Sequence, residues 1–270
     1  MPQAVHSLPY VAWVLLVALA FGSFAFVALT RSLTDATRGY LGFTAFSAGL
    51  LALLALFTDW GLTAPADLVI QTGQLSGLRQ LGIGAFMVGA FLYPINLWRG
   101  WISLGLAGVG AALTLGAAAF GWAPTAVDGV PLLVQLVVLS LVTGGSLAAI
   151  VLGHWYLVTP KISEKPLILQ AKALLALIGL QVLLFIVWTT LGGGPGQAAF
   201  DAFGGGNLLL VVLRLVITLL FPLVLCAMAW RTALTRSMES ATGLLYINLA
   251  AVMAGTIGAA ALYLSSGLLL

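Results

Sequence analysis

Long apolar runs follow one another along the whole chain, and short gaps between them hold most of its charged residues. Hydrophobic residues make up 62% of the sequence and charged residues 6%. A helix needs about 20 mainly apolar residues to cross the roughly 30 Å hydrocarbon core of a bilayer, and these runs have that length. The sequence therefore predicts a multi-pass protein of a cell membrane (the cytoplasmic membrane in a bacterium), with the lipid bilayer as its main partner.

The apolar runs favour helices over a membrane β-barrel. Backbone N–H and C=O groups find no hydrogen-bond partner in lipid, so only helices and closed barrels span a bilayer. Barrel strands of about 10 residues alternate between apolar and polar side chains, whereas the runs here are apolar on every face. We therefore expect an all-α helical bundle that forms one integral membrane domain over residues 1–270. The first run lacks a preceding Lys or Arg, which favours a retained span over a cleaved signal peptide.

The runs divide into eight predicted transmembrane helices. Residues 67–74 are assigned either to an interfacial turn or to the first turns of the third helix. The predicted spans are 8–30, 41–58, 72–98, 101–121, 131–158, 166–190, 207–230 and 241–267.

The Lys and Arg residues between the predicted spans lie in alternate connections. Lys and Arg favour the cytoplasmic side of a membrane. The odd-numbered connections hold Arg31, Arg38, Arg99, Lys161, Lys165, Arg231 and Arg236, and the even-numbered ones hold Asp59, Asp67, Asp128 and Asp201 without a Lys or Arg. This distribution predicts that both termini face outward.

A weak internal similarity relates the two halves of the chain. Arg79 and Arg214 each follow a leucine near the start of the third and the seventh predicted span. Four spans return a chain to its starting side, so units 8–121 and 131–267 would be parallel repeats, an arrangement found in transporters. Chance similarity within an apolar sequence is the alternative.

Arg214 is the most costly residue to place in this membrane. A charge within a span costs about 2.5–3.5 kcal/mol on insertion scales, so it usually faces a partner or a wet cavity. No Asp or Glu lies within the predicted spans, which leaves Gln181, Gln135, backbone carbonyls, lipid phosphate or an anionic ligand as its partners. Arg79, at a similar predicted height, would join it in an outward-facing anion site without carboxylates. Snorkelling to the headgroups is the alternative.

His154 and Lys172 define a second candidate site near the cytoplasmic side. They lie at comparable distances from the connection at 159–165, and a histidine there would bind a quinone carbonyl or relay a proton. A structural histidine is the alternative. His6 lies at the opposite membrane face, and with the single cysteine Cys226 the sequence predicts neither a metal site nor a cofactor.

The sequence favours a carrier over an enzyme. It contains no phosphate-binding glycine loop, no HExxH and no GxSxG motif, and it lacks the basic cluster of a nucleic-acid-binding surface. The first hypothesis is a transporter or channel-like carrier for a small anionic or amphipathic solute. The alternative is a non-catalytic anchor or quinone-contacting subunit of a respiratory-type complex. A weaker third is a lipid-modifying enzyme with Arg214 on the phosphate.

Overall fold

The structure is a computed structural model, which describes residues 2–63, 74–96, 100–159, 162–204 and 208–270, with side chains from Ser7 onward. These residues form helices and connections, and no strand occurs within the described ranges. Within these ranges, eight helices are long and apolar enough to cross a membrane. The predicted all-α class and the eight spans are confirmed.

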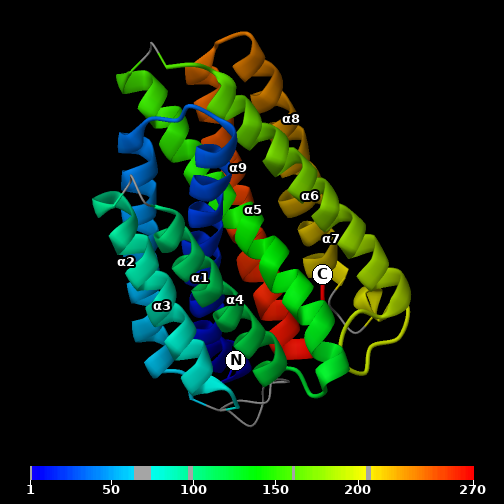
Figure 1. Ribbon diagram of the computed structural model, residues 1–270. Helices are drawn as coiled ribbons and strands as arrows, with labels where there is room; N and C mark the ends of the chain where they lie inside the picture. Colours follow the sequence, from blue (N-terminus) through cyan, green and yellow to red (C-terminus); the bar gives the residue numbers. More distant parts are fainter. Residues whose placement is uncertain (1, 64–73, 97–99, 160–161, 205–207) are drawn as a thin grey trace.

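The helices follow one another with short connections (Figure 1). The seventh crossing, Leu208–Leu234, consists of three consecutive helical segments, labelled α7, η3 and α8. The bounds are α1 Pro2–Leu33, α2 Arg38–Trp60, α3 Ser76–Ile95, α4 Trp101–Trp122, α5 Ala126–Val158, α6 Lys165–Leu191, the short η2 Asp201–Phe203, α7 Leu208–Leu215, η3 Val216–Leu220, α8 Phe221–Leu234 and α9 Met238–Ser266.

The start of the fifth span differs from the prediction, because this helix begins at Ala126 rather than at 131. Thr125 caps this helix, because its hydroxyl accepts a hydrogen bond from the Asp128 N–H at 3.3 Å. Pro131 therefore lies inside the helix rather than at its first position. The start of the third span falls mostly outside the described residues, since only Gln74 of the segment 67–74 is described.

Helices α1 and α5 lie side by side at the centre of the bundle, and glycines bring their backbones together. A Cβ added to Gly22 would lie 1.8 Å from the carbonyl oxygen of Ser140, and one added to Gly144 would lie 2.3 Å from the backbone nitrogen of Ser23. Small residues permit this approach in lipid, where packing drives helix association. The centre of the bundle is therefore filled by close backbone packing.

The remaining helices form two groups around this central pair. Helices α2, α3 and α4 pack successively beside α1, and α6, α8 and α9 pack successively beside α5. Helix α9 also contacts α1, and α4 also contacts α5, so the two groups meet on both sides of the centre. Figure 1 places both chain ends at the same end of the bundle, as an even number of crossings requires.

Candidate functional site

The seventh crossing changes its helical geometry at its middle, next to Pro222. A proline within a helix has no N–H to donate and crowds the carbonyl four residues earlier, here that of Thr218. The segment Val216–Leu220 adopts a π-helical turn, in which the Phe221 N–H donates to the carbonyl oxygen of Val216. Such turns absorb a local break in the hydrogen-bond ladder and occur frequently at functional sites.

Arg214 lies one turn before this break and is 4% exposed. Its Nη1 donates to the Thr218 hydroxyl at 3.0 Å, and its Nε donates to the carbonyl oxygen of Leu270 at 3.3 Å. A Cβ at Gly255 on α9 would lie 2.5 Å from Nη1, so the absence of a side chain at this position makes room for the guanidinium. Arg214 is therefore held by the Thr218 hydroxyl and the Leu270 oxygen.

The partners predicted for Arg214 are found only in part. Gln135 shares its acceptor, because the Gln135 Nε2 donates to the same Leu270 oxygen at 2.7 Å. Gln181 is buried on α6 but makes none of the hydrogen bonds found at Arg214. No ion pair joins Arg214 to an Asp or Glu in the part of the chain that the structure describes. The guanidinium charge is therefore not compensated by an Asp or Glu of the described residues.

An apolar groove of about 310 Å³ lies between the seventh crossing and α9, with Arg214 in its wall. Leu210, Leu213 and Ile217 line one side and are 51%, 43% and 46% exposed. Gly258 on α9 lines the other side, where an added Cβ would meet no atom within 4 Å. The arrangement joins a long apolar surface to one buried positive charge.

Arg79 does not take the role predicted for it, because it is paired with a carboxylate. Its Nε lies 2.5 Å from Oδ2 of Asp59, its Nη2 donates to Oδ1 of Asp59 at 3.2 Å, and Gln80 donates to the same Oδ1 at 3.0 Å. The prediction that no acid lies within a span was wrong: α2 continues to Trp60, and Asp59 is only 2% exposed. The predicted site of two arginines without carboxylates is therefore reduced to Arg214.

Two tryptophans enclose the Arg79 guanidinium further. Its Cζ lies 5.6 Å from the ring centroid of Trp13 and 5.5 Å from that of Trp122, and the two rings meet edge to face at 5.0 Å. An arginine over an aromatic face is stabilised by the ring quadrupole. Arg79 thus joins α1, α2, α3 and α4 at one end of the bundle.

His154 and Lys172 are not brought together. His154 is exposed on α5, and Lys172 is exposed on α6, with its Nζ 5.4 Å from the ring centroid of Trp230. Within the described ranges no hydrogen bond, ion pair or ring contact joins the two residues. The predicted quinone site gains no support from this arrangement.

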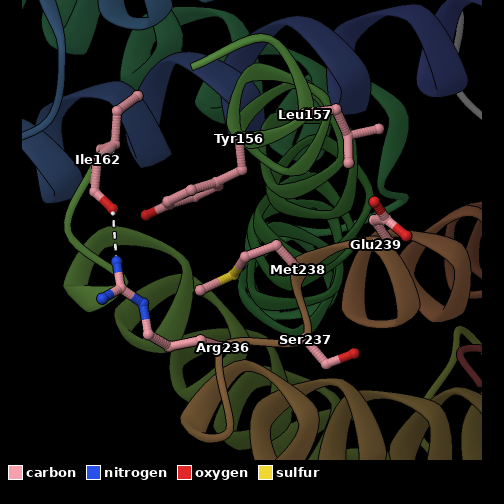
Figure 2. A pocket seen from close by; sticks show the side chains of 7 residues that line it. All are labelled: Tyr156, Leu157, Ile162, Arg236, Ser237, Met238 and Glu239. Carbon is pink, nitrogen blue, oxygen red and sulfur yellow. Dashed lines mark hydrogen bonds between the residues drawn. The ribbon is translucent and has the colours of Figure 1, made fainter. Parts of the chain in front are cut away.

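A polar pocket of about 340 Å³, which the sequence did not predict, lies at the opposite end of the bundle from the chain ends (Figure 2). Arg236 enters it from the connection between α8 and α9, and its Nη2 donates to the carbonyl oxygen of Ile162 at 3.5 Å. The Arg236 Nε also lies 3.5 Å from the Glu164 carboxylate, and the Tyr156 hydroxyl donates to Ser163 at 2.5 Å. The cation in this pocket is already compensated.

The groove at Arg214 is therefore the best candidate for ligand binding. Two of the six predicted site residues, Arg214 and Gln135, donate to one oxygen. Arg79 pairs with Asp59, and Lys172 lies over the Trp230 ring. Gln181 and His154 lie apart from this site. Comparisons with protein-family models, with curated proteins and with solved structures found no match.

Proposed function

We propose that this protein is a membrane carrier for an amphipathic anion, which places its charged head at Arg214 and its chain in the groove beside α9. The observation that carries the proposal is the contrast at the two buried arginines. Arg79 is paired with Asp59, whereas Arg214, in the wall of an apolar groove, has no Asp or Glu partner in the described part of the chain.

The chemistry of the groove defines the class of ligand. A guanidinium binds carboxylate or phosphate through charge-assisted hydrogen bonds, which are roughly twice as strong as those between neutral groups. The exposed side chains of Leu210, Leu213 and Ile217 favour an alkyl or acyl chain. The shared requirement is an oxyanion on an apolar chain, as a lipid or a single-chain amphiphile provides.

The arrangement of the helices is consistent with movement of such a ligand. Helix α1 contacts α2, α5 and α9, and α5 contacts α6, α1 and α4, so the two groups repeat one packing pattern. This pattern supports the proposed duplication of units 8–121 and 131–267, and parallel repeats of this kind occur in transporters. The π-helical turn at Val216–Leu220 provides a place for the seventh crossing to bend.

The proposed orientation places both termini outside, which puts the groove end of α7 in the outer leaflet. Single cysteines at Asp201 and Ser163 test it, since these residues lie in connections at opposite ends of the bundle. A membrane-impermeant maleimide added to intact cells should label Asp201→Cys and spare Ser163→Cys. Labelling in the reverse sense would invert the orientation, and labelling of both from outside would contradict the topology.

Binding and movement are tested with a fluorescent long-chain alkyl phosphate, the matching carboxylate and the matching neutral alcohol, using protein reconstituted in vesicles. We expect saturable binding of the two anions, weak binding of the alcohol, and faster movement of the anions across the vesicle membrane. Arg214→Gln should weaken anion binding by about 10-fold or more, since a hydrogen bond to a charged group contributes about 1.5–3 kcal/mol. Arg231→Gln is the matched control, because Arg231 is exposed at the other end of the same crossing.

The outcomes separate the candidate functions. Equal binding by wild type and Arg214→Gln would remove the proposed site. Binding without faster movement would retain the site but replace the carrier by an amphiphile-binding membrane subunit, and purification in mild detergent would then show whether other subunits accompany the chain.

A further inference from the structure

The wall of the groove that α9 provides consists mainly of small residues. These residues recur every three or four positions, so they lie on one face of the helix. They are Ala254, Gly258, Ala261 and Ser265. At about 1.5 Å per residue, they extend over about 16 Å of α9. The groove is therefore bounded on this side by a long strip with little side-chain volume.

The opposite wall carries large apolar side chains, which leave a narrow space between the two helices. Leu210, Leu213 and Ile217 line this wall. The groove volume of about 310 Å³ is at the lower end of the range of about 300–1,000 Å³ found for small-molecule sites. Distributed over about 16 Å of helix, it corresponds to a mean cross-section of about 20 Å². That cross-section accommodates one extended alkyl chain and leaves no space for a second chain beside it.

The guanidinium of Arg214 offers one nitrogen to a ligand in this space. Its Nη1 donates to the Thr218 hydroxyl and its Nε to the Leu270 oxygen. No group among the described residues accepts a hydrogen bond from Nη2. An oxyanion in the groove would be bound through Nη2 by a charge-assisted hydrogen bond, and its chain would lie along α9.

Two glycines of α9 that line the groove differ in what surrounds them. A Cβ at Gly255 would lie 2.5 Å from Nη1 of Arg214 and 2.8 Å from the Cβ of Thr218, so this glycine makes room for the guanidinium. A Cβ at Gly258, about one turn later, would meet no atom within 4 Å. Packing within the described protein therefore requires the first glycine and not the second. The missing side chain at Gly258 leaves open the part of the groove where a ligand chain would lie.

We propose that the groove selects amphiphiles with a single unbranched chain, and that Gly258 is the residue that determines this specificity. The inference rests on the proposed function and narrows its ligand from amphipathic anions in general to those with one chain. The oxyanion binds Nη2 of Arg214, and the chain passes over Gly258 along α9. The second chain of a two-chain membrane lipid has no place in the groove, so shape excludes the wrong ligand.

The first test compares two ligands with the same head group, using wild-type protein reconstituted in phosphatidylcholine vesicles. Lysophosphatidic acid has one acyl chain, and phosphatidic acid carries a second acyl chain on the same glycerol phosphate. Each is titrated against the bound fluorescent alkyl phosphate. We expect the one-chain ligand to displace it at a concentration lower by about 10-fold or more, because forcing a second chain into a filled space resembles overpacking of a core.

The second test fills the groove at Gly258. Gly258→Leu should weaken alkyl phosphate binding by about 10-fold or more, because its side chain occupies the space of the ligand chain. Gly258→Ala should have a smaller effect in the same direction. Gly243→Leu is the matched control, since Gly243 is an exposed glycine of the same helix outside the groove, and a Cβ there also meets no atom within 4 Å. Thermal unfolding of the two leucine variants should be equal.

The outcomes distinguish this inference from the proposed function. Equal displacement by the one-chain and the two-chain ligand would overturn the selection of single chains. Equal alkyl phosphate binding by Gly258→Leu and Gly243→Leu, or a loss of thermal stability in Gly258→Leu alone, would overturn the role of Gly258. In each case weaker binding by Arg214→Gln would leave the proposed function standing. Absence of alkyl phosphate binding to the wild type would overturn the proposed function itself.

Discussion

The two buried arginines, one in each helix group, have similar burial and opposite surroundings. Arg79 is 3% exposed and Arg214 is 4% exposed. Asp59 and two tryptophan rings surround the first, whereas the second contacts the Thr218 hydroxyl, the Leu270 oxygen and an apolar groove. Burial of a charge alone therefore does not mark a ligand site. The group that compensates the charge distinguishes a structural arginine from one that is available to a ligand.

The two arginines therefore differ in the partner that each needs to stabilise its buried charge. Removing one partner of a buried ion pair leaves an uncompensated charge and costs about 3–5 kcal/mol. Arg79 with Asp59 is such a pair, so the N-terminal group depends on both residues for its stability. Arg214 has no Asp or Glu partner among the described residues, so we expect an anionic ligand that binds it to stabilise the folded protein.

The largest expected effect is that of Asp59→Asn. This change keeps the shape of the side chain but removes the negative charge, and we expect it to lower the free energy of unfolding by about 3–5 kcal/mol. Thermal unfolding in detergent measures the effect, and Asp35→Asn, at an exposed position, is the control. A double change of Asp59 and Arg79 to leucine should recover most of the loss. If Asp59→Asn unfolds at the same temperature as the wild type, the buried Arg79 does not depend on the Asp59 carboxylate. The proposed difference between Arg79 and Arg214 would then be wrong.

The contact between Arg79 and Asp59 could not be predicted from the sequence. Hydropathy located the eight crossings, because the bilayer sets their length and composition. It assigned Asp59 to a connection, since an acid after an apolar run usually marks the end of a span. The three-dimensional packing of α2 against α3 decides instead that Asp59 meets Arg79, and such a contact between helices is not visible in hydrophobic periodicity.

The second effect concerns the contact that holds the two helix groups together. Gly144→Ala would place a Cβ 2.3 Å from the Ser23 backbone nitrogen and 2.5 Å from the Cα of Gly22, so α1 and α5 would have to separate. We expect a loss of about 1–3 kcal/mol, as for overpacking in a filled core. The matched control is Gly105→Ala, whose Cβ would meet no atom within 4 Å. Equal thermal stability of the two variants would show that the groups do not depend on this approach.

The sequence predicted only part of the candidate site. The cost of a charge in lipid singled out Arg214, and its list of neutral partners included Gln135. The Leu270 oxygen was not predicted, because it depends on the turn at Gly267 and on packing across α9. The groove likewise depends on which face of α7 meets α9, and the uniformly apolar runs do not reveal that choice.

The third effect tests whether the Thr218 hydroxyl positions Arg214. Thr218→Val keeps the side-chain shape and removes the hydroxyl that accepts from Nη1 at 3.0 Å. The guanidinium loses one fixed orientation, and we expect alkyl phosphate binding to weaken by about 3- to 10-fold, equivalent to about 0.6–1.4 kcal/mol. Thr190→Val is the control, because its hydroxyl donates to the Ile186 carbonyl of its own helix. Unchanged binding would mean that Thr218 does not position Arg214.

The smallest effect is expected at Lys172, a cation that is neither buried nor in the groove. Its ammonium lies 5.4 Å from the Trp230 ring centroid, and a cation–π contact at an exposed site contributes about 0.5–1 kcal/mol. Lys172→Gln should therefore lower the free energy of unfolding by no more than this amount and leave alkyl phosphate binding unchanged. Arg214→Gln should instead weaken alkyl phosphate binding without lowering the free energy of unfolding. A large loss of anion binding in Lys172→Gln would show that the ligand approaches along α6, and the contrast between Arg79 and Arg214 would then not be what selects the site.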